Sequence, residues 1–133
     1  MASVELEIPS RSVYVGVVRL AVASLARQSG LDEERVEDLK IAVSEACSNA
    51  LLVGKEDGAA SSICIRWNDD GGRVVVEVED RESSTYDSET PKEPGEAEQR
   101  LDLSIGLLRS LVDECDILPR DGGGTLTRLI VAG

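Results

Sequence analysis

Two polar residues four positions apart interrupt an otherwise apolar stretch of the sequence. The segment "KIAVSEACSNALLVG", residues 40–54, carries Glu45 and Asn49 among small and aliphatic residues. Residues four apart on a helix lie one turn apart on the same face. An amide oxygen can ligate Mg²⁺, and a carboxylate can orient or deprotonate a nucleophile. The pair therefore indicates either one wall of a ligand site or a solvated outer face, and spacing alone leaves both open.

The helix that must position this pair is predicted to follow a cap at Asp32 and to run to about Leu52. At 100° per residue its most apolar side should pack on a sheet, and that side consists of Val36, Leu39, Val43, Cys47 and Ala50. Glu45 and Asn49 fall on the opposite side, which also carries Asp38, Ile41 and Leu52. This second side is neither uniformly polar nor uniformly apolar.

The other elements predict a single domain over residues 1–133, an α/β chain of the α+β two-layer sandwich type. A mixed, mostly antiparallel sheet covered by helices on one face is the economical arrangement. The predicted elements are a strand at 4–8, a helix at 14–28, hairpin strands at 61–67 and 73–80 around Asn68–Gly72, a loop at 81–100, a helix at 103–114, and strands at 115–119 and 125–132 joined by a turn at Gly122–Gly124.

Composition excludes several classes of function. A formal charge of −12 disfavours direct nucleic-acid binding, which depends on clustered Lys and Arg. The absence of His removes Ser-His-Asp triads and His-ligated metals. No apolar run approaches the ~18 residues that would cross a membrane. Three separated cysteines inside apolar runs predict buried free thiols, so we expect a cytoplasmic protein.

The stretch "YVGVVRLAVASLARQSGLDEERVEDLKIAVSEACSNAL", from Tyr14 to Leu51, resembles the N-terminal half of the bacterial anti-sigma-factor serine kinases. These are small GHKL-type (Bergerat-fold) ATPases. Further along, "VVVEVED", "LLRSLVDECDI" and "GGTLTRLIV" resemble later segments of the same family in the same order. The resemblance therefore covers nearly the whole chain and implies a histidine-kinase-like ATPase fold.

The resemblance implies roles for individual residues. Glu45 would be the general base toward a substrate serine, and Asn49 would ligate Mg²⁺ on the phosphates of ATP. Asp80 would accept a hydrogen bond from the adenine amino group. Residues 81–103 would form a nucleotide lid. Other positions implied to bind the nucleotide are Gly54, Lys55, Ser104, Gly106 and Thr125; Lys55 could instead only end its helix with a favourable charge.

Two glycine motifs of the family are altered. Glu82 stands where the first glycine after Asp80 is expected, and Asp102 and Ser104 fall at the two positions of a G-x-G before the third helix. A carboxylate beside a triphosphate would repel it. Restoring glycine at these three positions is accordingly expected to strengthen ATP binding.

Two functions follow from this pattern. The first is a kinase that phosphorylates an anti-anti-sigma protein with ATP and Mg²⁺ and sequesters a sigma factor. The alternative is a regulator of the same fold that binds ATP weakly or not at all and acts by protein contact alone. The family further implies a homodimer, with no direct nucleic-acid partner and no membrane.

Overall fold

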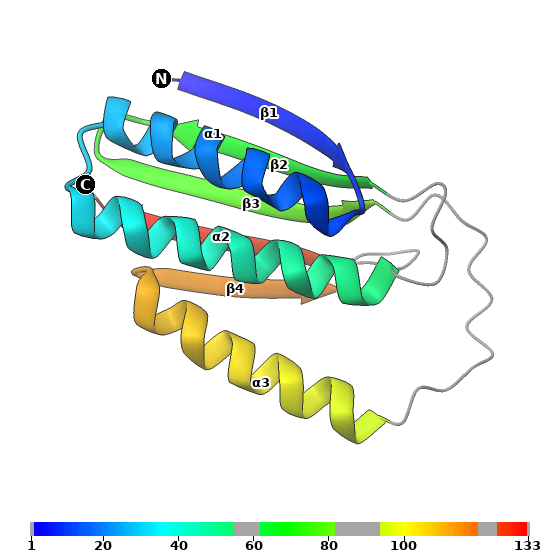
Figure 1. The fold of residues 1–133 in the computed structure, drawn as a ribbon. Helices are drawn as coiled ribbons and strands as arrows, with labels where there is room; N and C mark the ends of the chain where they lie inside the picture. Colours follow the sequence, from blue (N-terminus) through cyan, green and yellow to red (C-terminus); the bar gives the residue numbers. More distant parts are fainter. Residues whose placement is uncertain (1, 55–61, 82–93, 120–124, 133) are drawn as a thin grey trace.

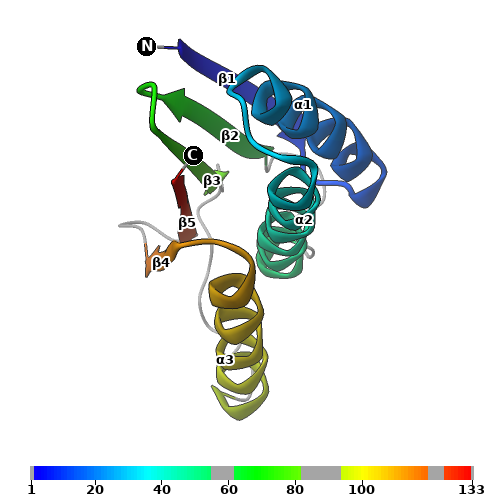
Figure 2. The same cartoon turned by 90° about the vertical axis from the view of Figure 1, so that its left-hand side faces the viewer.

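A computed structural model of the chain describes residues 2–54, 62–81, 94–119 and 125–132. These residues form a five-stranded sheet, three α-helices and a short 3₁₀ helix. The elements follow in the order β1 (Ala2–Pro9), η1 (Ser12–Tyr14), α1 (Val15–Gln28), α2 (Glu33–Gly54), β2 (Ser62–Asp69), β3 (Arg73–Arg81), α3 (Pro94–Leu111), β4 (Glu114–Pro119) and β5 (Thr125–Ala132). The helices lie on one side of the sheet (Figures 1 and 2). The predicted two-layer α+β sandwich is confirmed.

The sheet has the strand order β1-β2-β3-β5-β4, and each neighbouring pair is antiparallel. The described sheet is therefore antiparallel throughout, where the sequence suggested a mixed one. The reason lies in the connection after β3. Helix α3 leads from β3 to the outer strand β4 and leaves one strand position open between them. Strand β5 then fills that position and runs antiparallel to both β3 and β4.

Local turn chemistry sets two of the connections. The β2–β3 hairpin turns at Gly71, where φ is 93°, a value that glycine adopts without strain. In the same turn the Asp70 carboxylate accepts a hydrogen bond from the Arg73 N–H at 3.0 Å. Helix α1 ends in a Schellman motif at Gly30, with the Leu31 N–H donating to the Ala26 carbonyl. Each turn falls at the place that the sequence predicts.

The core lies between the sheet and α1 and α2. Alternate residues of the central strands face the helices and are buried, and they are Ile63, Ile65 and Trp67 of β2 and Val74, Val76 and Val78 of β3. The predicted sheet side of α2 is buried as well, at Val36, Leu39, Val43, Cys47 and Ala50. Asp32 caps this helix by accepting the Arg35 N–H at 2.8 Å. The orientation predicted for α2 is therefore confirmed.

The third helix was predicted with the wrong bounds. It begins at Pro94 and ends at Leu111, rather than running from 103 to 114. Proline is favoured at the first helical position, because its fixed φ suits the helix and the N–H that it lacks would be unsatisfied there anyway. Arg81 belongs to β3 and residues 94–100 belong to α3, so the predicted loop at 81–100 is also too long, while the lid at 81–103 stays a prediction. The remainder of that loop, at 82–93, and the turn at Gly122–Gly124 lie outside the described residues.

Among the described helices, none is both long enough and apolar enough to cross a bilayer.

Candidate functional site

The flank of α2 that carries Glu45 and Asn49 faces α3. Both side chains are half-buried, between the buried sheet side and exposed residues such as Ser48. The Asn49 Nδ2 donates a hydrogen bond of 2.5 Å to the Oγ of Ser104, which is 3% exposed on α3. The polar pair therefore lies along the junction of two helices, which is neither the sheet side nor a fully solvated face.

The contact with Ser104 involves the nitrogen end of the Asn49 amide. Because the nitrogen is engaged by the Ser104 hydroxyl, the oxygen Oδ1 is the end that has no partner within the described residues. An amide oxygen is the kind of ligand that Mg²⁺ accepts.

Glu45 lies one helical turn before Asn49 on the same flank. In the described part of the chain, its carboxylate makes no hydrogen bond and no ion pair. A half-buried carboxylate of this kind can accept a proton from a hydroxyl group placed beside it. One helix therefore presents a carboxylate that can accept a proton, at Glu45, and an amide that can ligate a metal ion, at Asn49.

Asp80 lies near the end of β3, with its side chain on the helix-facing side of the sheet. It is completely buried, and it follows the buried positions Val74, Val76 and Val78 in the strand's alternation. Burying an ionised carboxylate costs several kcal/mol unless it is hydrogen-bonded. The resemblance seen in the sequence implies that this carboxylate accepts a hydrogen bond from the adenine amino group of ATP.

The topology brings these residues to one end of the molecule. Helix α2 and strand β3 end there, and α3 begins there (Figure 1). The register Glu79↔Leu126 places Asp80 and Thr125 at neighbouring positions beyond that pair, since β3 and β5 are antiparallel. Of the predicted site residues, Asn49 and Ser104 are brought into contact, and Asp80 and Thr125 become strand neighbours.

A bound metal ion at this end would have few protein ligands. Among the described residues, no group of three or more His, Cys, Asp or Glu could hold a metal ion. Mg²⁺ typically keeps several waters and is held by one or two protein oxygens together with substrate phosphates. The donor set therefore fits Mg²⁺ delivered with a nucleotide and does not fit a resident metal centre.

The histidine kinase-like ATPase domain is the family whose model matches this chain, over residues 8–131. The chain belongs to this family. The family named from the sequence is thereby confirmed, and so is its fold.

Curated relatives are serine-protein kinases named RsbW. That of Bacillus velezensis is 32% identical over 127 residues, which covers 90% of this chain and 79% of the relative. That of Bacillus subtilis is 31% identical over the same length and coverage. That of Listeria innocua is 31% identical over 131 residues, with 90% and 81% covered. The similarity extends across nearly the whole ATPase domain.

A solved structure supports the fold. The RsbU and RsbW domains of Rv1364c from Mycobacterium tuberculosis match with a TM-score of 0.73 at 19% identity. The match covers 98% of this chain and 32% of that longer one, so the present chain corresponds to about a third of it. At this identity the likeness shows a shared fold and nothing about activity.

Other predicted site residues are placed differently. Gly54 ends α2, and Lys55 and Glu82 lie outside the described residues. Ser104 and the backbone of Asp102 lie inside α3, so the expectation that these two positions come before the third helix is wrong. Gly106 is exposed in the same helix, and a Cβ added to it would meet no described atom within 4 Å. No described group approaches Gly106 closely enough to require glycine there.

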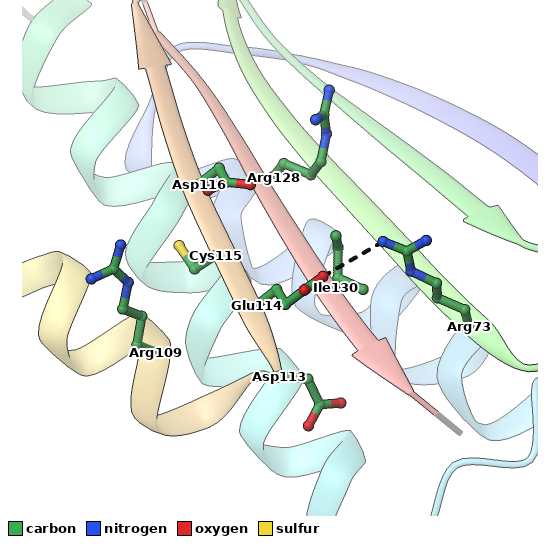
Figure 3. A pocket seen from close by; sticks show the side chains of 8 residues that line it. All are labelled: Arg73, Arg109, Asp113, Glu114, Cys115, Asp116, Arg128 and Ile130. Atoms are coloured by element: carbon green, nitrogen blue, oxygen red, sulfur yellow. Dashed lines mark ion pairs between the residues drawn. The ribbon is translucent and has the colours of Figure 1, made fainter.

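A separate hollow of about 520 Å³ follows strand β4 (Figure 3). Three arginines and three carboxylates line it, together with two further residues; they are Arg73, Arg109, Asp113, Glu114, Cys115, Asp116, Arg128 and Ile130. Arg73 pairs with Glu114 at 3.5 Å, and burial raises the pKa of the Cys115 thiol above its usual value. The hollow is balanced in charge and offers no activated nucleophile. Sequence reasoning missed it because residues on four separate elements, β3, α3, β4 and β5, form it.

Proposed function

We propose that this chain is a serine kinase that uses ATP and Mg²⁺ to phosphorylate an anti-anti-sigma protein, and that it sequesters a sigma factor once that protein is phosphorylated. Its similarity to serine-protein kinases supports the serine kinase activity. One observation carries the assignment of the site. Glu45 and Asn49 share the flank that faces α3, and among the described residues the carboxylate has no partner while the amide nitrogen contacts Ser104.

The described residues suit the needs of phosphoryl transfer, which are mainly positioning and charge neutralisation. ATP would supply the phosphoryl group, and Mg²⁺ would neutralise charge on its phosphates. Glu45 accepts the proton of the substrate serine as the serine oxygen bonds to the terminal phosphorus and the bond to the ADP oxygen breaks. Asn49 offers Oδ1 to the metal ion, and Asp80 accepts a hydrogen bond from the adenine amino group.

Calorimetric titration with ATP, in Mg²⁺ and in EDTA, tests the nucleotide part of the proposal. We expect micromolar binding that requires Mg²⁺ and that is weaker for GTP, which presents a carbonyl where adenine has its amino group. Absence of heat up to millimolar ATP would reject the kinase assignment. Glu82 and Asp102, which the sequence places at glycine positions, are the residues whose charge would then explain the failure.

We also propose a cytoplasmic homodimer. The described cysteines are all buried free thiols, which suits a reducing compartment. Among the described elements, none covers the sheet face opposite the helices, so that face is available to a second copy. Sedimentation equilibrium at micromolar concentration is expected to give the mass of two chains, and the mass of one chain would reject the dimer.

A second candidate function is regulation by protein contact without nucleotide, and the outer face of α1 favours it. Val13, Val17 and Leu20 are 73%, 50% and 74% exposed, which forms an apolar stripe at helical spacing. Residues 10–30 contain three arginines and no Asp or Glu, in a chain whose net charge is −12. Arg11 and Arg19 are exposed beside the stripe. A protein partner with an acidic and apolar surface would complement this face.

Charge reversal at α1 tests the second candidate. The Arg19→Glu variant is expected to weaken binding of the sigma factor or of the anti-anti-sigma protein at least tenfold, with the loss measured in the absence of nucleotide. The matched control is Arg27→Glu on the same helix, because Arg27 is already paired with Glu33 at 2.9 Å. An equal effect of both variants would show a general charge effect rather than a docking face.

A further inference from the structure

A hollow of about 290 Å³ lies between the first turns of α2 and the last turn of α3. Four carboxylates and one arginine line it, and they are Asp32, Glu34, Asp38, Asp113 and Arg35. The arginine is paired with Asp113 at 3.2 Å, whereas Glu34 and Asp38 have no ion pair or side-chain hydrogen bond within the described residues. The hollow is therefore acidic, and two of its carboxylates are not neutralised by a neighbour.

The stripe that lines this hollow on α2 continues along the helix to the proposed general base. Its members are spaced four, three and four residues apart, and they are Glu34, Asp38, Ile41 and Glu45. Residues at these spacings share one face of a helix. Ile41 is 48% exposed, so an uncovered aliphatic side chain lies between the acidic hollow and Glu45.

Helix α3 supplies the opposite wall, since Leu111 lines the hollow as well. Leu107 and Leu103 precede it by about one and two turns on the same side of α3, and they are 41% and 77% exposed. The two helices run antiparallel, and they touch again where Ser104 contacts α2 (Figure 1). The two walls therefore stay together from the hollow past Glu45, with exposed leucines along the α3 side.

We propose that this surface, the α2–α3 groove, binds the protein whose serine is phosphorylated. The groove is formed by Glu34, Asp38, Ile41, Leu103 and Leu107. Its occupant is a segment of that protein with one cationic and one aliphatic side chain near the serine. The inference rests on the proposed function, since it takes the general base from there.

Charge and spacing select this occupant. The two carboxylates without a neutralising neighbour attract a Lys or Arg side chain and disfavour an acidic one. Covering Ile41 and Leu107 with an aliphatic side chain removes apolar surface from water, which favours association. Asp38 lies seven residues from Glu45, which is about 10 Å along a helix. The cationic side chain is therefore expected about 10 Å from the serine, with the aliphatic side chain between them.

The experiment is steady-state phosphorylation of a purified anti-anti-sigma protein of the same organism by the whole chain and by three variants, Asp38→Asn, Asp38→Lys and Leu107→Ala. We expect KM for that protein to rise roughly fivefold or more in Asp38→Lys and in Leu107→Ala. Asp38→Asn keeps the shape of the side chain and removes its charge, so it should raise KM by a smaller factor without a folding defect. The kcat and the affinity for ATP should stay unchanged, because these contacts serve docking only.

Two matched controls lie outside the groove. Glu37→Lys makes the same change in charge one position away, where Glu37 is paired with Lys40 at 3.3 Å. Leu118→Ala removes a leucine of β4 whose exposure matches that of Leu107, at 42% against 41%. Both controls should keep the wild-type KM.

Titration of the isotope-labelled chain with the same protein gives a readout without catalysis, because the amide resonances of the groove residues should move. Unmoved resonances, an unchanged KM in Asp38→Lys or in Leu107→Ala, or an equal rise in the controls would overturn the groove as the docking surface and leave the kinase proposal standing. A fall in kcat at unchanged KM would overturn it too, since docking contacts act on KM. Failure of the wild type to phosphorylate the protein would instead overturn the proposed function, and this inference with it.

Discussion

Two regions of this molecule carry glutamates on rigid elements, and they treat them differently. On the sheet face opposite the helices, Arg66 bonds Glu79 at 2.5 Å and Glu77 at 3.4 Å, and Arg128 bonds Glu77 at 3.2 Å. On the flank of α2, Glu45 has no such partner among the described residues. The glutamates paired with arginine stabilise the sheet. Glu45, which is held on a helix without a described ion-pair partner, is instead available to accept a proton.

The largest expected effect comes from removing the charge of Glu45. Glu45→Gln keeps the shape of the side chain and removes the base, and general base catalysis typically contributes 10²- to 10⁴-fold in rate. We expect phosphorylation of the anti-anti-sigma protein to fall by about that factor, with unchanged unfolding free energy and unchanged Mg²⁺-ATP binding. Transfer of radiolabelled phosphate, urea unfolding and calorimetry measure the three quantities.

The control for that experiment is Glu79→Gln on the open sheet face. It should reverse the pattern, with a lower unfolding free energy and nearly unchanged activity per folded molecule, because the partner Arg66 loses its strongest contact. If Glu45→Gln kept wild-type phosphorylation, Glu45 would not be the general base, and the glutamates of the two regions would not differ in their role in catalysis.

A smaller effect is expected from breaking the network at Arg66. In Arg66→Met the stem of the side chain is retained and the guanidinium is lost. Glu79, only 7% exposed, is then left without its arginine. We expect a loss of roughly 1–3 kcal/mol in unfolding free energy, below the cost for a fully buried pair because Arg66 is partly exposed.

An exposed ion pair in the same chain provides the comparison. Arg27 and Glu33 are bonded at 2.9 Å with side chains 50% and 69% exposed. Arg27→Met should lower the unfolding free energy by less than Arg66→Met does, as is usual for surface pairs. Equal losses for the two variants, measured by urea unfolding at the same ionic strength, would show that burial does not distinguish the pairs.

The smallest expected effect concerns acid stability. Asp113 accepts a hydrogen bond from the Ala132 N–H at 2.6 Å, and this bond, followed by the pairing with Arg35, lowers the pKa of the carboxyl below its ordinary value of 3.8. A group with a lowered pKa contributes stability above its ordinary pKa, and that contribution is lost as the pH falls through the lowered value. Asp113→Asn should therefore show a shallower loss of unfolding free energy below about pH 4.

Measurement of the unfolding free energy from pH 7 to pH 3 tests this expectation. Asp69 has a lowered pKa as well, from hydrogen bonds donated by Ser29 and the Gly71 N–H, and it remains in the variant. A difference between the two proteins that vanishes at low pH is the expected signature. A constant difference at all pH values would show that only packing was changed.

The sequence by itself determined the local structure of this protein. The end of the first helix at Gln28, the cap at Asp32, the turn within Asn68–Gly72 and the buried stripe of α2 each depend on residues within a few positions of one another. Backbone freedom, capping groups and helical periodicity act over that range, so those predictions hold. The same local rules led to a wrong start for α3, because Pro94 reads equally as a loop residue or as a first helical residue.

Only the tertiary structure decided what surrounds the candidate site. The contact of Asn49 with Ser104, the burial of Asp80 and the absence of a described partner for Glu45 depend on how α2, α3 and β3 pack. No periodicity encodes those neighbours, because they lie tens of residues apart in the chain. A serine that looked like a lost glycine in the sequence is, once the helices are packed, a hydrogen-bond acceptor for the residue implied to bind the metal ion.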